Sequence, residues 1–242
     1  PIIHETLDYW QGTQVDTTMS RRTTSLSARL YFSHSHHKTN RNIWGGYQTN
    51  VSQPSMRSLL NIRTDSDPLN IQLGNPNLRP SRSHSIYGNY REKLRRTLVN
   101  ASFNFDATQD AVATAVLYDK QTGVRTSSPQ NIDGNWNTNA SAGVDFPLDH
   151  KERLRLKQTF RHRHIHSVDL MNNARSVVAS NYFDDELSLS WKPTDKLDFT
   201  AKGDLHYQRS TSARADFTRI NVFDFDYSLA FTFHSRIGNC RL

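Results

Sequence analysis

Three histidines at alternating positions are the side chains of this sequence best suited to chemistry. His162, His164 and His166 are each two residues apart, so in a β-strand their imidazoles share one face. Two such imidazoles are able to hold a metal ion. Because the three share the parity of the apolar side chains of their segment, and no acidic side chain is placed to orient the rings, we expect an outward polar collar and no metal site.

A basic row occupies the opposite face of the same segment. Its members are Arg155, Lys157, Arg161 and Arg163. Such a row is able to meet an anionic substrate or to pair with acidic side chains on neighbouring strands. Because cations spread along a polar face are usually paired or solvated, we expect pairing or solvation here.

Two further groups of ionisable residues are interpreted as solvated. The first lies in an expected short turn and consists of His34, His36 and His37. The second is an acidic run at an expected boundary between loop and strand, Asp184, Asp185 and Glu186. The acidic run lacks the number and spacing of oxygen ligands that a calcium-binding loop requires.

Catalytic motifs are absent from the sequence. It contains no G-x-S-x-G elbow, no H-E-x-x-H motif and no phosphate-binding P-loop. Its single cysteine, Cys240, excludes an internal disulfide and a cysteine-based zinc site. The formal net charge is +7, but aromatic and charged side chains take opposite faces, which disfavours nucleic-acid binding. We therefore expect no enzyme activity, no cofactor and no nucleic-acid partner.

The elements that position these residues follow a two-residue period, which is the period of a β-strand. In 223–233, large apolar side chains alternate with Asp224, Asp226, Ser228, Ala230 and Thr232. The same alternation recurs in 26–33, 98–105, 139–146, 187–192 and 197–208. No segment shows a comparable helical stripe, so the fold class is expected to be all-β.

The alternation predicts about nine strands, with the first dozen residues as part of another. The nine lie near 24–34, 42–52, 80–91, 96–118, 124–147, 152–167, 181–192, 196–209 and 220–234. Strands of soluble proteins average about 5–6 residues, whereas a tilted membrane-spanning strand needs about 9–11. The mean hydropathy of −0.73 does not exclude a membrane barrel, because only every second residue of a barrel strand faces lipid.

The expected connections are short at one end of the strands and long at the other. The short ones are 91–96, 148–151 and 193–196, and the long ones are 52–80, 167–181 and 209–221, with 119–123 as a turn at the long-loop end. This is the layout of outer-membrane barrels. We therefore expect an antiparallel, up-and-down sheet from a transmembrane barrel, although the solvated face of a soluble β-sandwich tolerates the same residues.

Residues 65–80 carry the most specific pattern of the chain, DSDPLNIQLGNPNLRP. It resembles a segment of TonB-dependent outer-membrane receptors, particularly the Bacteroidetes-type outer-membrane β-barrel family, and the resemblance extends over the chain from about residue 24. The matching positions are Asp67, Pro68, Leu69, Asn70, Gly74, Asn75, Pro76, Asn77, Leu78 and Pro80. Because proline fixes φ and glycine permits tight turning, we expect this motif to have a structural role, not a ligand contact.

The resemblance implies a receptor of the bacterial outer membrane, surrounded by lipid and lipopolysaccharide. Such receptors take up a siderophore, a cofactor, a glycan or a peptide, and a plug domain couples them to the TonB complex. The plug is not in this sequence, and the family's barrels have about 22 strands. We therefore expect residues 1–242 to be one partial barrel domain, an open curved sheet from a fragment, for which TonB coupling requires the missing plug.

Two other functions are consistent with the pattern. One is a non-transporting outer-membrane barrel for adhesion or assembly. The other is a soluble, glycan-binding β-sandwich, which predicts shorter strands in two packed sheets.

Overall fold

The structure is a computed structural model that describes residues 2–11, 14–38, 40–64, 66–214, 217–234 and 239–241. Its regular structure is almost entirely β-strand. The one helix in the described part, α1 (Met56–Leu59), has four residues. No helix in these ranges is long and apolar enough to cross a membrane. The expectation of an all-β fold is confirmed.

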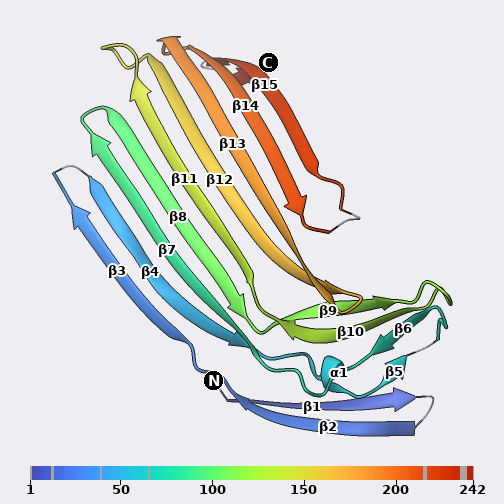
Figure 1. The fold of residues 1–242 in the computed structure, drawn as a ribbon. Helices are drawn as coiled ribbons and strands as arrows, with labels where there is room; N and C mark the ends of the chain where they lie inside the picture. Colours follow the sequence, from blue (N-terminus) through green and yellow to red (C-terminus); the bar gives the residue numbers. More distant parts are fainter. Residues whose placement is uncertain are drawn as a thin grey trace.

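Most of the long strands form one curved antiparallel sheet, which we call the wall (Figure 1). Its strands are β3 (Ala28–His36), β4 (Arg41–Ser52), β7 (Ser81–Leu94), β8 (Thr97–Gln109), β11 (Asn135–Pro147), β12 (Leu154–Met171), β13 (Ala174–Thr194), β14 (Leu197–Ser212), β15 (Ile220–His234) and the short β16 (Asn239–Arg241). They are hydrogen-bonded in this order. The meander of about nine long strands is therefore confirmed.

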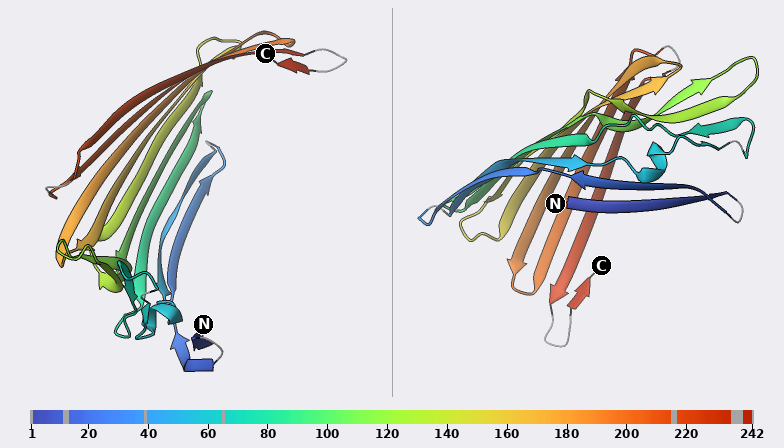
Figure 2. Two further views of the ribbon diagram at one scale, coloured as in Figure 1. Left: turned by 90° about the vertical axis from the view of Figure 1, so that its right-hand side faces the viewer. Right: turned by 90° about the horizontal axis from the view of Figure 1, so that it is seen from below.

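The wall is open in the part of the chain that the structure describes. β3 pairs with β4 alone, and the far side of β15 pairs only with the three residues of β16. Figure 2 shows the sheet curling without its two edges meeting. The chain thus forms an open section of a barrel.

The register gives the wall one apolar face and one polar face. On β15, Phe223, Phe225, Tyr227 and Leu229 share a face and are 56% to 78% exposed. Leu205 of β14 lies opposite Phe225 and continues the same apolar surface. Among the described residues no second sheet covers this face. A two-layer β-sandwich would bury it, so the soluble β-sandwich is wrong.

Where the long loops begin, the chain leaves the wall and forms a smaller structure. Asp110 (φ 50°) and Gly134 (φ 101°) follow β8 and precede β11, and between them β9 (Ala111–Tyr118) and β10 (Arg125–Ile132) form an antiparallel ribbon. β6 (Asn70–Leu73) pairs in parallel with β10, and β5 (Arg63–Thr64) pairs with β6. We call α1, β5, β6, β9 and β10 the shelf (Figure 1).

The N-terminal residues form a hairpin of their own, β1 (Ile2–Gln11) and β2 (Gln14–Thr24). Arg21 pairs with Glu5 across the hairpin and donates Nη1 to the carbonyl oxygen of Pro54 at 2.9 Å. This bond ties the hairpin to the segment that precedes the shelf. The first dozen residues do contain a strand, but it pairs with β2 and not with the wall.

Two strands that the alternation predicts as continuous are interrupted. The 96–118 segment is divided into β8 and β9, and 124–147 is divided into β10 and β11. The two-residue period persists across each break because both pieces are strands. It therefore gives no sign that β9 and β10 turn away from the wall.

The expected long link at 167–181 is wrong. β12 extends to Met171 and β13 begins at Ala174, so only Asn172 (φ 52°) and Asn173 (φ 60°) connect them. Asparagine tolerates the positive φ that a two-residue hairpin turn requires. Two adjacent valines interrupt the alternation here, which is why the pattern predicts a loop.

The short turns and the 52–80 link agree with the expected layout. Two-residue turns stand at 95–96 and 195–196, and a longer turn stands at 148–153. The link after β14 is shorter than expected, 213–219, because β14 extends to Ser212. Residues 52–80 do leave the wall, and they contribute α1, β5 and β6 to the shelf.

Candidate functional site

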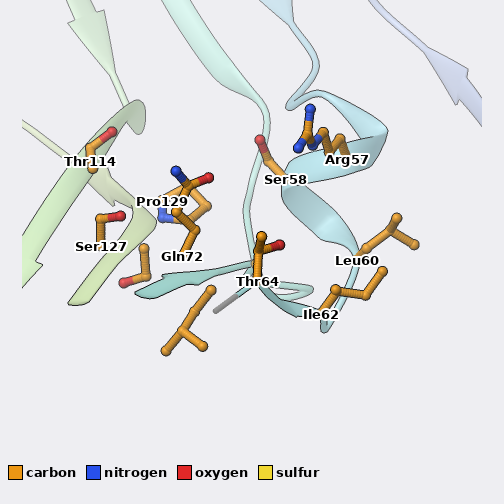
Figure 3. A pocket seen from close by; sticks show the side chains of 12 residues that line it. Arg57, Ser58, Leu60, Ile62, Thr64, Gln72, Thr114, Ser127 and Pro129 are labelled. Carbon is orange, nitrogen blue, oxygen red and sulfur yellow. The ribbon is translucent and has the colours of Figure 1, made fainter. Parts of the chain in front are cut away.

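The shelf forms a cavity of about 230 Å³ that is open on one side (Figure 3). Its polar lining side chains come from all five shelf elements and are Arg57, Ser58, Thr64, Gln72, Thr114, Ser127 and Ser128. Segments more than 50 residues apart in the sequence therefore meet at one place. The cavity lies at the end of the wall opposite the turns at 95–96, 148–153 and 195–196.

Gly74, the glycine of the family motif, forms part of the cavity lining. A Cβ atom at this position would lie 1.7 Å from the carbonyl oxygen of Leu60. The backbone is held there by two hydrogen bonds, from the Gly74 amide to the Ile62 oxygen at 3.1 Å and from the Asn75 amide to the Ser58 oxygen at 2.7 Å. Only glycine fits this close approach of two backbone segments.

Asn75 connects the motif to the β9–β10 ribbon. Its Nδ2 donates to the carbonyl oxygen of Pro129 at 3.0 Å, and its Oδ1 accepts from the Asn77 amide at 2.9 Å. The second bond closes a turn in which Pro76 supplies a fixed φ. Leu78, which follows this turn, is buried. The motif thus holds the long loop against the ribbon.

Asn131 makes a second connection between motif and ribbon. Its Oδ1 accepts from the Arg79 amide at 2.7 Å, while its Nδ2 donates to the carbonyl oxygens of Arg79 at 2.9 Å and of Asp110 at 2.7 Å. Arg79 also pairs with the Asp110 carboxylate. Pro80 then leads directly into β7. Sequence reasoning missed Asn131, because nothing in its local pattern shows that it meets a segment 52 residues away.

The first part of the motif forms a turn before β6. Asp67 accepts hydrogen bonds from Asn70 Nδ2 and from the Leu69 amide, the latter at 3.0 Å, with Pro68 between them in the turn. The bond from Asn70, and then the bond from the Leu69 amide, hold the pKa of Asp67 below its usual value. These residues lie outside the cavity lining.

The cavity is suited to binding a small polar ligand. The guanidinium of Arg57 is exposed and has no hydrogen-bond or ion-pair partner among the described residues. Hydroxyl and amide groups surround it. A guanidinium offers up to five donors in a planar fork, so the arrangement fits an oxygen-rich or anionic group.

The three histidines lie on the apolar face of β12, as their parity predicts. His164 Nδ1 lies 2.8 Å and His162 Nε2 lies 3.3 Å from Oδ1 of Asn181 on β13. His166 Nδ1 lies 2.7 Å from the carbonyl oxygen of Gly134. The described part of the chain contains no group of three metal-binding side chains placed to share an ion.

The cations of β12 lie on the polar face, and three of them form ion pairs. Arg155 Nη2 is 2.8 Å from Asp145 Oδ1. The carboxylate of Glu186 on β13 forms ion pairs with two cations. Its Oε2 lies 3.4 Å from Arg161 Nη2, and its Oε1 lies 3.6 Å from Lys157 Nζ. The expected pairing with acidic side chains is confirmed for these three.

The fourth cation of the row and the acidic run lie further along the same strands. The Arg163 guanidinium lies 4.3 Å from the centre of the Tyr182 ring. Asp184 pairs with His206 on β14 at 2.7 Å, whereas Asp185 lies on the apolar face beside Gln158. The acidic run was expected at a strand boundary, but it lies in the middle of β13, because the strand starts at Ala174.

The remaining residues singled out from the sequence lie at the other end of the wall. His34 and His36 belong to β3, and only His37 lies in the following turn. The expected turn therefore begins later than predicted. Cys240 belongs to β16, and its side chain falls outside what the structure describes.

Comparison with known proteins agrees with this architecture. No curated protein and no solved structure matches the chain. The model of the outer membrane protein beta-barrel family matches residues 9–242, which include the wall, the shelf and the motif. A long-stranded meander with one apolar face is the architecture that such a family requires. The chain belongs to the outer membrane protein β-barrel family and is a protein of the bacterial outer membrane.

Proposed function

We propose that this chain supplies wall and extracellular loops of a TonB-dependent receptor that takes up a nutrient. The nutrient classes that fit are a siderophore, a cofactor, a glycan or a peptide. The observation that carries the proposal is the polar cavity to which the GNPNLRP segment contributes Gly74. This segment resembles the receptors' own, and here its glycine and asparagine hold a polar cavity together at the long-loop end.

The position of the cavity supports a role in capture from outside. In outer-membrane barrels the long loops are extracellular and the short turns periplasmic. The shelf stands at the long-loop end, so Arg57 and its neighbouring hydroxyl groups face the side from which a nutrient arrives. A cavity of about 230 Å³ is smaller than the roughly 300–1,000 Å³ of ligand pockets, so it suits one polar end of a larger ligand.

The open wall supports a barrel completed by further strands. An unpaired sheet edge cannot face lipid, because its backbone groups have no water to bond. The edges at β3 and at β15 therefore require strands from outside the described residues. A barrel widened in this way has room for a plug domain against the polar face, and such a plug would be the contact with the TonB complex.

Uptake by whole cells tests the proposal. A strain that lacks the gene is compared with its parent for accumulation of labelled iron–siderophore complexes, cobalamin and oligosaccharides. A receptor predicts that one class fails to accumulate, and that a protonophore or loss of TonB abolishes its uptake in the parent. Normal uptake of every class, or uptake that continues without TonB, would instead indicate a non-transporting or passive barrel.

The cavity itself is tested by Arg57→Gln, with Arg63→Gln as a control for loss of one exposed positive charge from the same loop. Because Arg57 lines the cavity and Arg63 does not, only Arg57→Gln should weaken ligand binding to isolated outer membranes. Equal effects of the two variants would show that the cavity is not the ligand site.

A further inference from the structure

The apolar face of the wall ends in a polar border toward the long loops. On β13 the face runs from Trp191 through Leu189 and Leu187 to Phe183, and the next residue on that face is Asn181. Asp185 lies between Leu187 and Phe183 on this face and accepts a hydrogen bond from Gln158 of β12. Ten residues of a strand tilted by 35–45° rise about 25 Å, which is the height of the apolar band of an outer-membrane barrel. Asn181 therefore stands at the level of the outer-leaflet headgroups.

Asn181 presents an unused pair of donors at this border. Its Oδ1 is engaged on the β12 side by His164 and His162, at 2.8 and 3.3 Å. On the β14 side, Arg209 lies directly opposite Asn181 in the sheet. Among the described residues Nδ2 of Asn181 has no hydrogen-bond acceptor, so its two N–H groups remain available beside Arg209.

Arg209 differs from the paired cations Arg155 and Arg161 of the polar face. It is exposed and has no ion-pair partner in the described part of the chain. The two residues opposite it are Asn181 and Asn221, and neither is acidic. By contrast, Arg155 and Arg161 on the polar face are both paired with carboxylates. Arg209 thus carries a free positive charge at the border.

Aromatic rings lie directly on the membrane side of the two donors. Phe183 on β13 and Tyr207 on β14 lie two residues from Asn181 and Arg209, on the side of the apolar face. Their ring centres are 6.0 Å apart. Phe183 also stacks on His162 at 4.5 Å. Beyond them lie Leu205 on β14 and, opposite it on β13, Asp185, after which the face continues with Leu187. A ligand held at the border therefore has an apolar surface immediately beneath it.

We propose that Asn181 and Arg209 bind a phosphate group of an anionic outer-leaflet lipid whose acyl chains lie against the apolar face below. A guanidinium donates two parallel hydrogen bonds to a phosphate, and the amide of Asn181 adds another. The histidines act by holding Oδ1 and so turning Nδ2 toward the phosphate. A lipid fits better than free phosphate because the donors border the acyl-chain surface.

Native mass spectrometry tests this site on protein purified from outer membranes in dodecyl maltoside, with whatever strands complete its barrel. The probe is diphosphoryl lipid A. A charge-assisted pair of this kind predicts that Arg209→Gln weakens binding at least about tenfold. Lys202→Gln is the control, since it removes a positive charge from the same strand on the polar face, and it should bind as the unaltered protein does.

A second variant separates phosphate recognition from folding. Asn181→Asp keeps the oxygen that the histidines contact, but replaces the donor amide by a negative charge. It should reduce lipid A binding at least as much as Arg209→Gln, while heat-modifiable gel mobility confirms a folded barrel. If Arg209→Gln fails to fold, Arg209→Lys, which keeps the charge without the planar fork, should bind with intermediate affinity.

Two further probes identify the source of the phosphate. Dephosphorylated lipid A should bind equally weakly to the unaltered protein and to Arg209→Gln, and millimolar inorganic phosphate should not displace diphosphoryl lipid A. The proposal is overturned if Arg209→Gln or Asn181→Asp retains full binding of diphosphoryl lipid A. It is also overturned if Lys202→Gln weakens this binding as much as Arg209→Gln does. Displacement by inorganic phosphate alone would likewise show a free-anion site and not a lipid site.

Discussion

The side chain of Asn131 is hydrogen-bonded to both backbone groups of Arg79, accepting from the amide at 2.7 Å and donating to the carbonyl oxygen at 2.9 Å. The two residues are 52 positions apart. One side chain thus fixes where the long loop returns to the wall. Because the same Nδ2 also reaches the Asp110 oxygen, this residue joins the loop, the break after β8 and the ribbon.

Replacing Asn131 by alanine should loosen the shelf and leave the wall intact. It removes three hydrogen bonds, each contributing about 1 kcal/mol, and frees the backbone of Arg79 and the carbonyl oxygen of Asp110 from the ribbon. Amide hydrogen exchange in 53–80 should rise at least about tenfold, while exchange in β12 and β13 stays unchanged. Asn77→Ala is the control, since the Asn77 side chain makes none of these bonds, and equal loosening by both variants would contradict the role given to Asn131.

Gly74→Ala should disrupt the cavity. Its Cβ would lie 1.7 Å from the Leu60 oxygen, so the two backbone segments must separate, at a cost of about 1–3 kcal/mol for such overpacking. Limited proteolysis should cleave the 53–80 loop faster than in the unaltered protein. Gly88→Ala is a matched control, because a Cβ at Gly88 meets nothing within 4 Å. Similar protease resistance of both variants would show that Gly74 is not constrained.

The β9–β10 turn should depend on pH through Asp119. Its carboxylate accepts from Thr122 Oγ1 at 2.7 Å and from the Gln121 amide at 2.8 Å. The Thr122 bond, followed by the Gln121 bond, lowers the pKa of Asp119 below the usual value. A depressed folded-state pKa gives stability that is present above the unfolded pKa of about 3.9 and lost as pH falls through the folded pKa.

Carbon-13 NMR of labelled aspartate checks this expectation. The Asp119 carboxyl should titrate below the usual range, and Thr122→Val should raise its pKa by removing the largest cause. Lys120→Ala in the same turn should leave the titration where it is. An unchanged Asp119 pKa in Thr122→Val would show that the hydroxyl does not hold the carboxylate.

A charged side chain introduced on the apolar face should destabilise the folded barrel, whereas the same charge on the polar face should be tolerated. Leu229 is 78% exposed on the apolar face of β15, and arginine on the lipid side of a barrel costs about 2–4 kcal/mol near the bilayer centre. Leu229→Arg should therefore lower the folded fraction in lipid vesicles, measured by heat-modifiable gel mobility. Ala230→Arg adds the same charge on the polar face, opposite Thr200. Equal losses for the two variants would contradict the assignment of the faces.

The amino-acid sequence by itself determined the strands and the two faces of the wall. Side chains alternate across a strand by local geometry, so parity alone placed His162, His164 and His166 on the apolar face and Arg155 on the polar face. The same local signal placed the tight turns. The prediction of a long loop at 167–181 is wrong, because the alternation is interrupted there. A two-residue turn of asparagines connects the strands instead.

Only the tertiary structure decided which distant residues meet. Where β9 and β10 leave the wall, how Asn131 reaches Arg79 and why Gly74 has no room for a side chain all depend on pairing between segments far apart in the sequence. The same holds for Asn181 and Arg209, which became neighbours through the register of β13 and β14. A two-residue period does not determine the register between neighbouring strands, because shifting one strand by two residues leaves every side chain on the same face.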